Sequence, residues 1–153
     1  MSTILGLAGR TGPDRGSYGT LADVVGRDDV MRWVAAYERA WRAGEVAALA
    51  GLFTEDARYR RSPYEPVEVG LAAIGAFWRE DEGETFTVRA EPVAVEGTDA
   101  VVRLQVRYGD PVYEEYCDLW VLRFAADGRV EDFEEWAYWP GRPYSAGGRG
   151  TPH

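Results

Sequence analysis

The sequence predicts a single α+β domain in which three N-terminal helices pack on a strongly bent antiparallel sheet. Apolar residues recur at helical spacing in the first half of the chain and alternate with polar residues in the second half. Glycine-containing turns separate the alternating segments. Helices followed by a meander of strands are typical of a domain with its helices on one face of the sheet. The length of 153 residues is that of one domain.

The first predicted helix starts after Asp28 and Asp29, acidic residues that can cap a helix N-terminus. Its apolar residues follow one helical face: Val30, Trp33, Val34, Tyr37 and Trp41. Gly44 ends it, because glycine readily adopts the left-handed conformation found at helix C-termini. We expect Trp33 and Trp41 to be core residues.

Two shorter helices and one strand are predicted before the main sheet. The second helix is marked by the apolar residues Val46, Leu49, Leu52 and Phe53. A short strand over 57–61 follows and ends at Ser62 and Pro63. The third helix is marked by Leu71, Ile74, Phe77 and Trp78.

From Thr85 the period of the apolar residues changes to two. Four strands are predicted, over 85–95, 99–108, 112–124 and 129–139. The turns between them contain Gly97, Gly109 and the pair Asp127-Gly128, which is a strong tight-turn signal. Glycine-rich segments with little periodicity flank this region, so we predict a domain over 28–140, a flexible arm over 1–27 and a flexible tail over 141–153.

The amino-acid composition excludes several classes of binding surface and active site. A net charge of −9 argues against a nucleic-acid surface, and no apolar stretch approaches membrane length. The seventeen basic residues are all Arg, so a Schiff-base lysine is excluded, and the lone His153 excludes a His-based triad or a zinc site of several His. Cys117 is the only cysteine, so no intrachain disulfide can form. We expect a cytoplasmic protein that uses neither a metal nor an organic cofactor.

Several runs of residues, in their order along the chain, resemble motifs of the SnoaL-like (nuclear-transport-factor-type) superfamily. The runs are 40–45, 52–57, 70–74 with 77–78, 122–130 and 136–139. They extend roughly from Val30 to Trp139. The resemblance implies a cone-shaped fold with an internal small-molecule pocket, and dimers through the sheet face. It says little about reaction type, because the superfamily includes isomerases, polyketide cyclases, epoxide hydrolases, dehydratases and non-catalytic binders.

Two activities of the superfamily can be compared residue by residue. The resemblance places Tyr37 at the oxygen-polarising Tyr of ketosteroid isomerase, but Arg61 at its Asp base and Trp120 at its second Asp. Steroid-type isomerisation is therefore not expected. For limonene-type epoxide hydrolase, the resemblance places Tyr59, Arg103 and Glu135 at the Tyr, the central Arg and one carboxylate. Gln105 replaces the other carboxylate and Arg61 replaces an Asn, and a glutamine cannot exchange a proton as an acid does.

The strand over 99–108 allows two assignments of its inward face. Simple burial would place the apolar set inside, namely Val102, Leu104, Val106 and Tyr108. The resemblance instead implies that the other set faces the cavity, namely Val101, Arg103, Gln105 and Arg107. We follow the resemblance here, and the apolar set would then be an uncovered face that predicts a homodimer.

The same register predicts inward residues on the last two strands. On 112–124 these are Glu114, Tyr116, Asp118, Trp120 and Leu122. On 129–139 they are Phe133, Glu135, Ala137 and Trp139. Cys117 is expected to face away from the pocket.

The predicted catalytic chemistry is acid–base. Carboxylates in a partly dry, aromatic-walled site have displaced pKa values, which suits Asp118 or Glu135 to proton transfer. Arg103 and Arg61 would stabilise an oxyanion, with hydroxyl donors at Tyr37 and Tyr59. The expected substrate is hydrophobic or polyketide-like. Its other contacts would come from Gln105, Arg107, Tyr116, Trp120, Trp139, Trp78 and Phe53, although Trp78 and Phe53 also sit at expected core positions.

A second interpretation stays open. In this interpretation the arginines and acids would form a structural ion-pair network rather than a catalytic site. Such networks perturb pKa values as active sites do. The domain would then be a non-catalytic ligand-binding or dimerisation module of the same fold.

Overall fold

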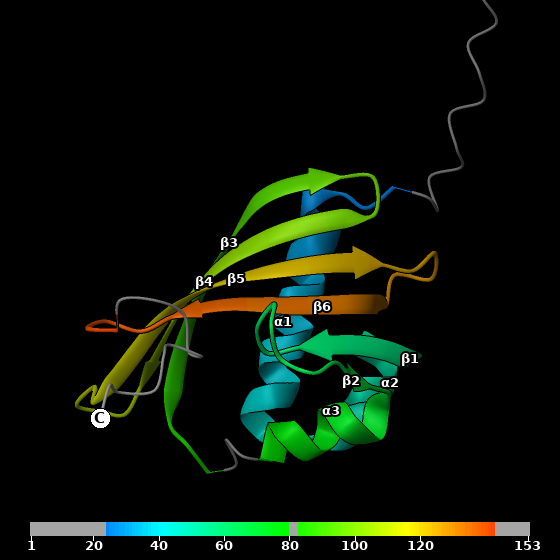
Figure 1. Cartoon of the computed structure of the whole chain (residues 1–153). Coiled ribbons are helices and arrows are strands. Elements are labelled where there is room, and N and C mark those ends of the chain that lie inside the picture. Colours follow the sequence, from blue (N-terminus) through cyan, green and yellow to red (C-terminus); the bar gives the residue numbers. More distant parts are fainter. Residues whose placement is uncertain (1–23, 80–82, 143–153) are drawn as a thin grey trace, which may run out of the picture.

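The computed structural model describes residues 24–79 and 83–142. The first half contains α1 (Arg27–Ala43), the 3-10 helix η2 (Val46–Ala48), α2 (Leu49–Leu52), β1 (Phe53–Arg60), β2 (Glu68–Val69) and α3 (Leu71–Trp78). The second half contains β3 (Phe86–Glu96), β4 (Asp99–Tyr108), β5 (Glu114–Phe124) and β6 (Val130–Tyr138). Figure 1 shows the helices together with one curved sheet, which confirms the predicted α+β class.

The described strands form one sheet in the order β2-β1-β6-β5-β4-β3 (Figure 1). The predicted meander β3-β4-β5-β6 is antiparallel throughout. The sheet as a whole is mixed, because β1 pairs parallel with β6. A parallel pair needs a long connection, and here that connection includes α3 and the four strands β2, β3, β4 and β5. The two-residue strand β2 is too short to leave a pattern in the sequence.

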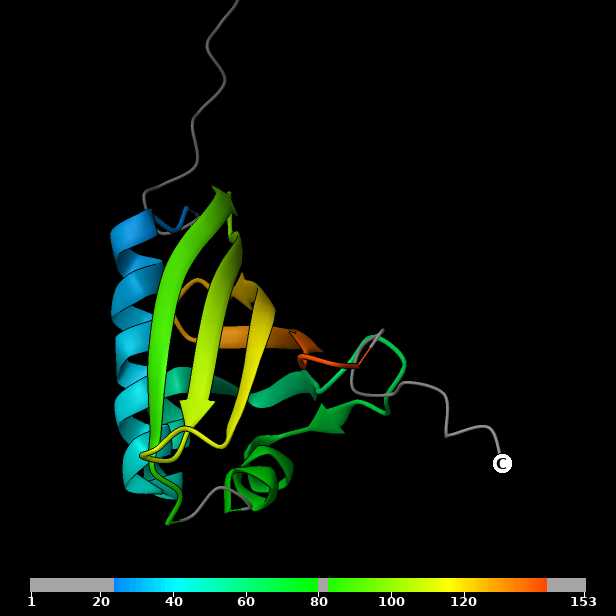
Figure 2. The same ribbon diagram turned by 90° about the vertical axis from the view of Figure 1, so that its left-hand side faces the viewer.

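Helix α1 lies along one face of the sheet (Figure 2). It begins at Arg27, and the Asp29 carboxylate accepts a hydrogen bond from the Gly26 backbone N–H at 3.0 Å. Asp29 therefore stabilises the first turn from within the helix, as the acid of a capping box does. Gly44 ends the helix with φ 64°, in the left-handed region that glycine adopts without strain, as predicted.

The core beneath α1 is built from aromatic side chains. Trp33 is buried, and its indole N–H donates to the Leu52 carbonyl oxygen at 2.9 Å. Its ring contacts Tyr37, Phe53 and Phe133 with centroids 5.3–6.1 Å apart. Edge-to-face and tilted contacts of this kind add to the free energy gained by burial. The prediction that Trp33 is a core residue is confirmed.

The inward face of β4 differs from the one we chose. Val102, Leu104 and Val106 are buried, whereas the Arg103 side chain is 60% exposed and pairs with Glu91 at 3.0 Å. Leu104 lies opposite Asp118 on the neighbouring strand β5. Opposite residues of an antiparallel pair share a face, so the inward side of β5 fixes that of β4. The face implied by the resemblance is wrong, and simple burial is correct.

Two other predicted site residues on β4 also lie on the outer face of the sheet. Arg107 lies on the outer face, where its Nε donates to Glu115 at 3.0 Å. Gln105 lies opposite the exposed Cys117, also on the outer face. The apolar set that was expected to form a dimer interface, from Val102 to Tyr108, is the inner face instead.

The predicted inward faces of the last two strands are confirmed. Asp118, Trp120 and Leu122 are buried on β5, and Phe133 and Ala137 are buried on β6. Cys117 is exposed and faces away from the interior, as expected. The cytoplasmic location stays a prediction from the sequence.

The predicted arm and tail lie mostly outside the described residues, which omit 1–23 and 143–153. The described end of the arm contacts the turn between β3 and β4, because the Val25 N–H donates to the Gly97 carbonyl oxygen at 3.0 Å. Strand β1 begins at Phe53, four residues before the predicted strand. Phe53 therefore belongs to a strand rather than to the second helix.

Candidate active site

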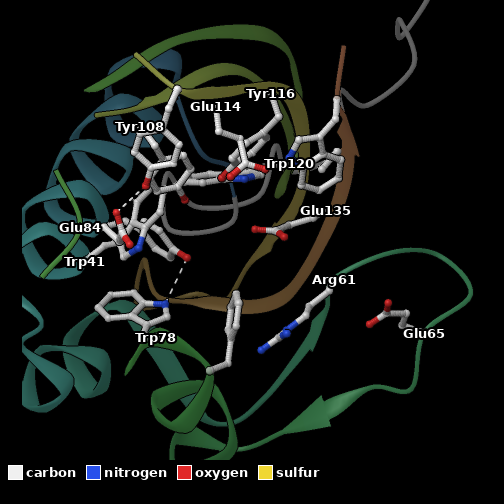
Figure 3. A pocket seen from close by; sticks show the side chains of 15 residues that line it. Trp41, Arg61, Glu65, Trp78, Glu84, Tyr108, Glu114, Tyr116, Trp120 and Glu135 are labelled. Carbon is white, nitrogen blue, oxygen red and sulfur yellow. Dashed lines mark hydrogen bonds between the residues drawn. The ribbon is translucent and has the colours of Figure 1, made fainter. Parts of the chain in front are cut away.

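A cavity of about 370 Å³ opens between the helices and the inner face of the sheet (Figure 3). Its wall takes side chains from α1, α3, β4, β5, β6 and the intervening loops. The fifteen lining residues are Tyr37, Trp41, Arg61, Glu65, Phe77, Trp78, Glu84, Tyr108, Tyr113, Glu114, Tyr116, Trp120, Glu135, Ala137 and Trp139. The volume is at the lower end of the range for small-molecule sites.

Glu135 is the acid that β6 places inside this cavity. Its side chain is half-buried, and Figure 3 shows its carboxylate directed between Arg61 on one side and Tyr116 and Trp120 on the other. The Tyr59 hydroxyl donates to Glu135 Oε1 at 2.7 Å. A hydrogen bond of this length orients the carboxylate.

A chain of hydrogen bonds leads from α3 to Glu135. The Trp78 indole N–H donates to the Tyr37 hydroxyl at 3.2 Å, and the Tyr37 and Tyr59 hydroxyls also interact by hydrogen bonding. Trp78, Tyr37 and Tyr59 therefore form a hydrogen-bonded series that ends at the Glu135 carboxylate.

The tyrosines of the site are hydroxyl donors at neutral pH. Burial raises the pKa of Tyr37, Tyr59 and Tyr116 above the usual value of 10.0. The negative charge of Glu135 is the second cause of the raised pKa in all three. Protonated phenols in this position can donate to an oxyanion, but they cannot act as bases.

Asp118 lies behind the cavity wall. It is 3% exposed and is not one of the lining residues. Its Oδ2 accepts from the Trp120 indole N–H at 3.0 Å, and its Oδ1 accepts from the Trp136 backbone N–H at 3.1 Å. Burial raises the pKa of Asp118 to about 7, against the lowering effect of these bonds. Asp118 thus orients a wall residue and ties β5 to β6.

The sequence matches the family model of the SnoaL-like domain over residues 33–133. The chain belongs to the SnoaL-like domain family. This confirms the resemblance seen in the motifs. A comparison with curated proteins finds no match.

Solved structures share the fold of this SnoaL-like domain. An epoxide hydrolase of the LEH-like type from M. tuberculosis is 15% identical, with a TM-score of 0.59 over 73% of this chain and 84% of that one. A putative ketosteroid isomerase from Kribbella flavida is 19% identical, with a TM-score of 0.57 over 74% and 79%. A putative polyketide cyclase from Sinorhizobium meliloti is 23% identical, with a TM-score of 0.53 over 72% and 99%. Identities this low show the fold alone.

The cavity of this SnoaL-like domain is not rich in arginine, contrary to our expectation. Of the predicted arginines, Arg61 lines it, and its guanidinium carbon lies 3.9 Å from the centre of the Phe77 ring. Arg103 and Arg107 lie on the outer sheet face, where each pairs with a glutamate. The alternation of β4 allows no other outcome once its apolar residues are buried.

The predicted contact residues divide in the same way. Four of them line the cavity: Trp78, Tyr116, Trp120 and Trp139. Phe53 is fully buried in the aromatic core and does not line the cavity. Gln105 is excluded from the cavity by its position on the outer face.

Sequence reasoning missed several lining residues. Tyr108 follows the buried set of β4, so the rejected alternation already indicated it. Trp41 was expected in the core and forms cavity wall as well. Glu84 and Tyr113 come from loops, and the Tyr113 hydroxyl donates to the Glu84 carboxylate at 2.6 Å. No periodic signal could have joined two loops 29 residues apart in the sequence.

Within residues 24–79 and 83–142, no group of three or more His, Cys, Asp and Glu side chains is arranged to hold a metal ion. Within the same ranges, none of the helices has both the length and the apolar character needed to cross a membrane.

Proposed function

We propose that the cavity binds a small molecule and that Glu135 transfers a proton to or from it. The reaction would be an isomerisation, cyclisation, dehydration or epoxide opening, on a substrate with hydrophobic surface. The observation that carries this proposal is the position of Glu135, a half-buried carboxylate inside an aromatic cavity and held there by Tyr59. A carboxylate in such surroundings is a competent general base or acid.

The neighbouring residues have distinct proposed roles. Tyr59 orients Glu135, and Tyr37 presents its hydroxyl to the cavity as a donor for an oxyanion. Arg61 would stabilise developing negative charge at one side of the cavity. Asp118 supports the site as a positioning residue, since its carboxylate bonds the indole of Trp120.

A nitrobenzisoxazole tests the proposal without knowledge of the natural substrate. In this aromatic probe a base removes the ring C–H proton, the electron pair forms a nitrile, and the N–O bond breaks to release a coloured phenolate. We expect the protein to accelerate the reaction, and Glu135→Gln to reduce the rate by about a hundredfold, because general bases typically contribute that much.

The matched control is Glu134→Gln, one residue away on the opposite face of β6, where Glu134 pairs with Arg60 at 3.1 Å. This variant should retain the wild-type rate. Equal rates for Glu135→Gln and wild type, with both proteins folded by circular dichroism, would remove Glu135 from the chemistry and favour the non-catalytic alternative.

A dimer is the second part of the proposal, and it now rests on different residues. The outer face of β5 and β6 exposes the apolar side chains Leu119, Val121, Trp136 and Tyr138. They alternate with the inward residues of the same strands and form a contiguous set across the pair. A second copy of the chain that covers this face would remove apolar surface from water.

A further inference from the structure

The charge of the described cavity lining is predominantly negative. Four lining residues are glutamates: Glu65, Glu84, Glu114 and Glu135. Arg61 is the one described lining residue with a positive charge, and its guanidinium is stacked over Phe77 at one side. Anions are repelled by such a lining, because low-dielectric walls focus the field of the charges.

The remaining wall is largely aromatic. Nine of the fifteen lining residues are Trp, Tyr or Phe. Tyr116 lies between two other rings, with its centroid 5.1 Å from Trp139 and 6.2 Å from Tyr108. The face of an aromatic ring carries negative potential and attracts cations within about 6 Å of its centre. The rings and the glutamates together therefore favour a positive charge in the cavity.

The pKa values of two lining tyrosines reflect this negative charge. The carboxylate of Glu135 raises the pKa of Tyr37 and of Tyr116, which both line the cavity. It does so because a second negative charge nearby is unfavourable. The interaction that opposes a phenolate at these positions would stabilise a positive charge.

We propose that the ligand of this cavity carries a positively charged nitrogen, as a protonated amine or a quaternary ammonium group. The nitrogen lies between the ring faces, and Glu114 and Glu84, both exposed, attract it where the cavity opens to solvent. This inference rests on the proposed function in one respect only, that the cavity is the ligand site. It does not require that Glu135 transfers a proton.

Three probes of similar size and different charge test the inference. They are benzyltrimethylammonium, benzyl alcohol and benzoate, and binding is measured by quenching of tryptophan fluorescence and by calorimetry. We expect the ammonium probe to bind at least tenfold more tightly than benzyl alcohol, and benzoate to bind most weakly. Added salt should weaken the binding of the ammonium probe and leave benzyl alcohol unaffected.

Two adjacent glutamates provide matched variants. Glu114 lines the cavity, whereas Glu115 lies on the opposite face of β5 and pairs with Arg107. Glu114→Gln should weaken the ammonium probe on the order of threefold and leave benzyl alcohol unchanged, as expected for a partly screened charge. Glu115→Gln should change neither affinity.

The outcomes separate this inference from the proposed function. Equal affinity for the three probes, tighter binding of benzoate, or no binding of the ammonium probe overturns the cationic ligand. Proton transfer from the nitrobenzisoxazole is unaffected by any of these results. Conversely, loss of the Glu135 effect on that reaction leaves a measured preference for the ammonium probe standing.

Discussion

Asp118 and Glu135 are carboxylates on neighbouring strands with different surroundings. Asp118 is enclosed and accepts hydrogen bonds from Trp120 and from the backbone of Trp136. Glu135 reaches the cavity and accepts a hydrogen bond from the hydroxyl of Tyr59. The sequence indicated both as candidate acids by their register, but register alone could not show which one reaches the ligand. That difference depends on side-chain length and on the rings packed around each acid.

The pKa of Asp118 predicts a pH-dependent stability. The folded state retains the proton up to about pH 7, whereas the unfolded chain releases it near the usual pKa of 3.8. Between these values the folded state binds more protons, so the free energy of unfolding falls as the pH rises. A shift of this size corresponds to about 4 kcal/mol at most. Above pH 7 this contribution is constant.

Asp118→Asn isolates the contribution of this group, because asparagine has no proton to lose. Urea unfolding at pH 5 and pH 8 should show a smaller difference between the two pH values in the variant than in the wild type. Identical pH dependence in both proteins would show that Asp118 has an ordinary pKa in the folded state.

At the scale of elements, β4 shows that the alternation of apolar residues in a sequence can predict which face of a strand is buried. Its alternation predicted the correct inward face, because burial of the apolar residues Val102, Leu104 and Val106 is favourable. The error came from carrying a register over from relatives, since a shift of one residue exchanges the two faces of a strand. The helices, the four-stranded meander and the glycine turns were predictable because each has a local periodic signal.

Other parts of the site had no such signal. The parallel pairing of β1 with β6 joins segments far apart in the sequence, and it places Tyr59 opposite Phe133 and near Glu135. The bond between Tyr113 and Glu84 joins two loops. Contacts of this kind depend on the assembled sheet rather than on local propensity.

The two faces of β4 predict opposite responses to substitution. Leu104→Glu buries a charge in the core and should lower the free energy of unfolding by more than about 3 kcal/mol, or prevent folding. Arg103→Gln removes an exposed ion pair and should change it by less than about 1 kcal/mol. Denaturant titration measures both. A tolerated Leu104→Glu together with a damaging Arg103→Gln would return the strand to the opposite register.

At the scale of the whole molecule, the two sheet faces have separate proposed uses. The inner face supplies β5 and β6 side chains to the cavity, and the outer face exposes Val121 and Trp136, each 39% exposed. A ligand site and a self-association surface can therefore share the same two strands without competing. The fold class and the family could be predicted from the sequence, whereas the residues of the outer apolar set followed only once the register was known.

Val121→Arg tests the association. We expect the wild type to be a dimer by light scattering after size-exclusion chromatography, and the variant to be a monomer, because the desolvation of a charged side chain in the interface is costly. The control is Val69→Arg on β2, where the valine is 55% exposed at the far edge of the sheet. A monomeric wild type, or a Val121→Arg variant that stays dimeric, contradicts the interface.

The most direct measurement of the central claim, that the cavity around Glu135 is the ligand site, is a titration followed by the indole N–H signals in nuclear magnetic resonance. Trp41, Trp78, Trp120 and Trp139 line the cavity, whereas Trp136 lies on the outer face. Nitroindazole, an unreactive analogue of nitrobenzisoxazole, should shift the four cavity signals in parallel and leave Trp136 in place. A shift of Trp136 alone, or no shift at saturating concentration, would contradict the claim.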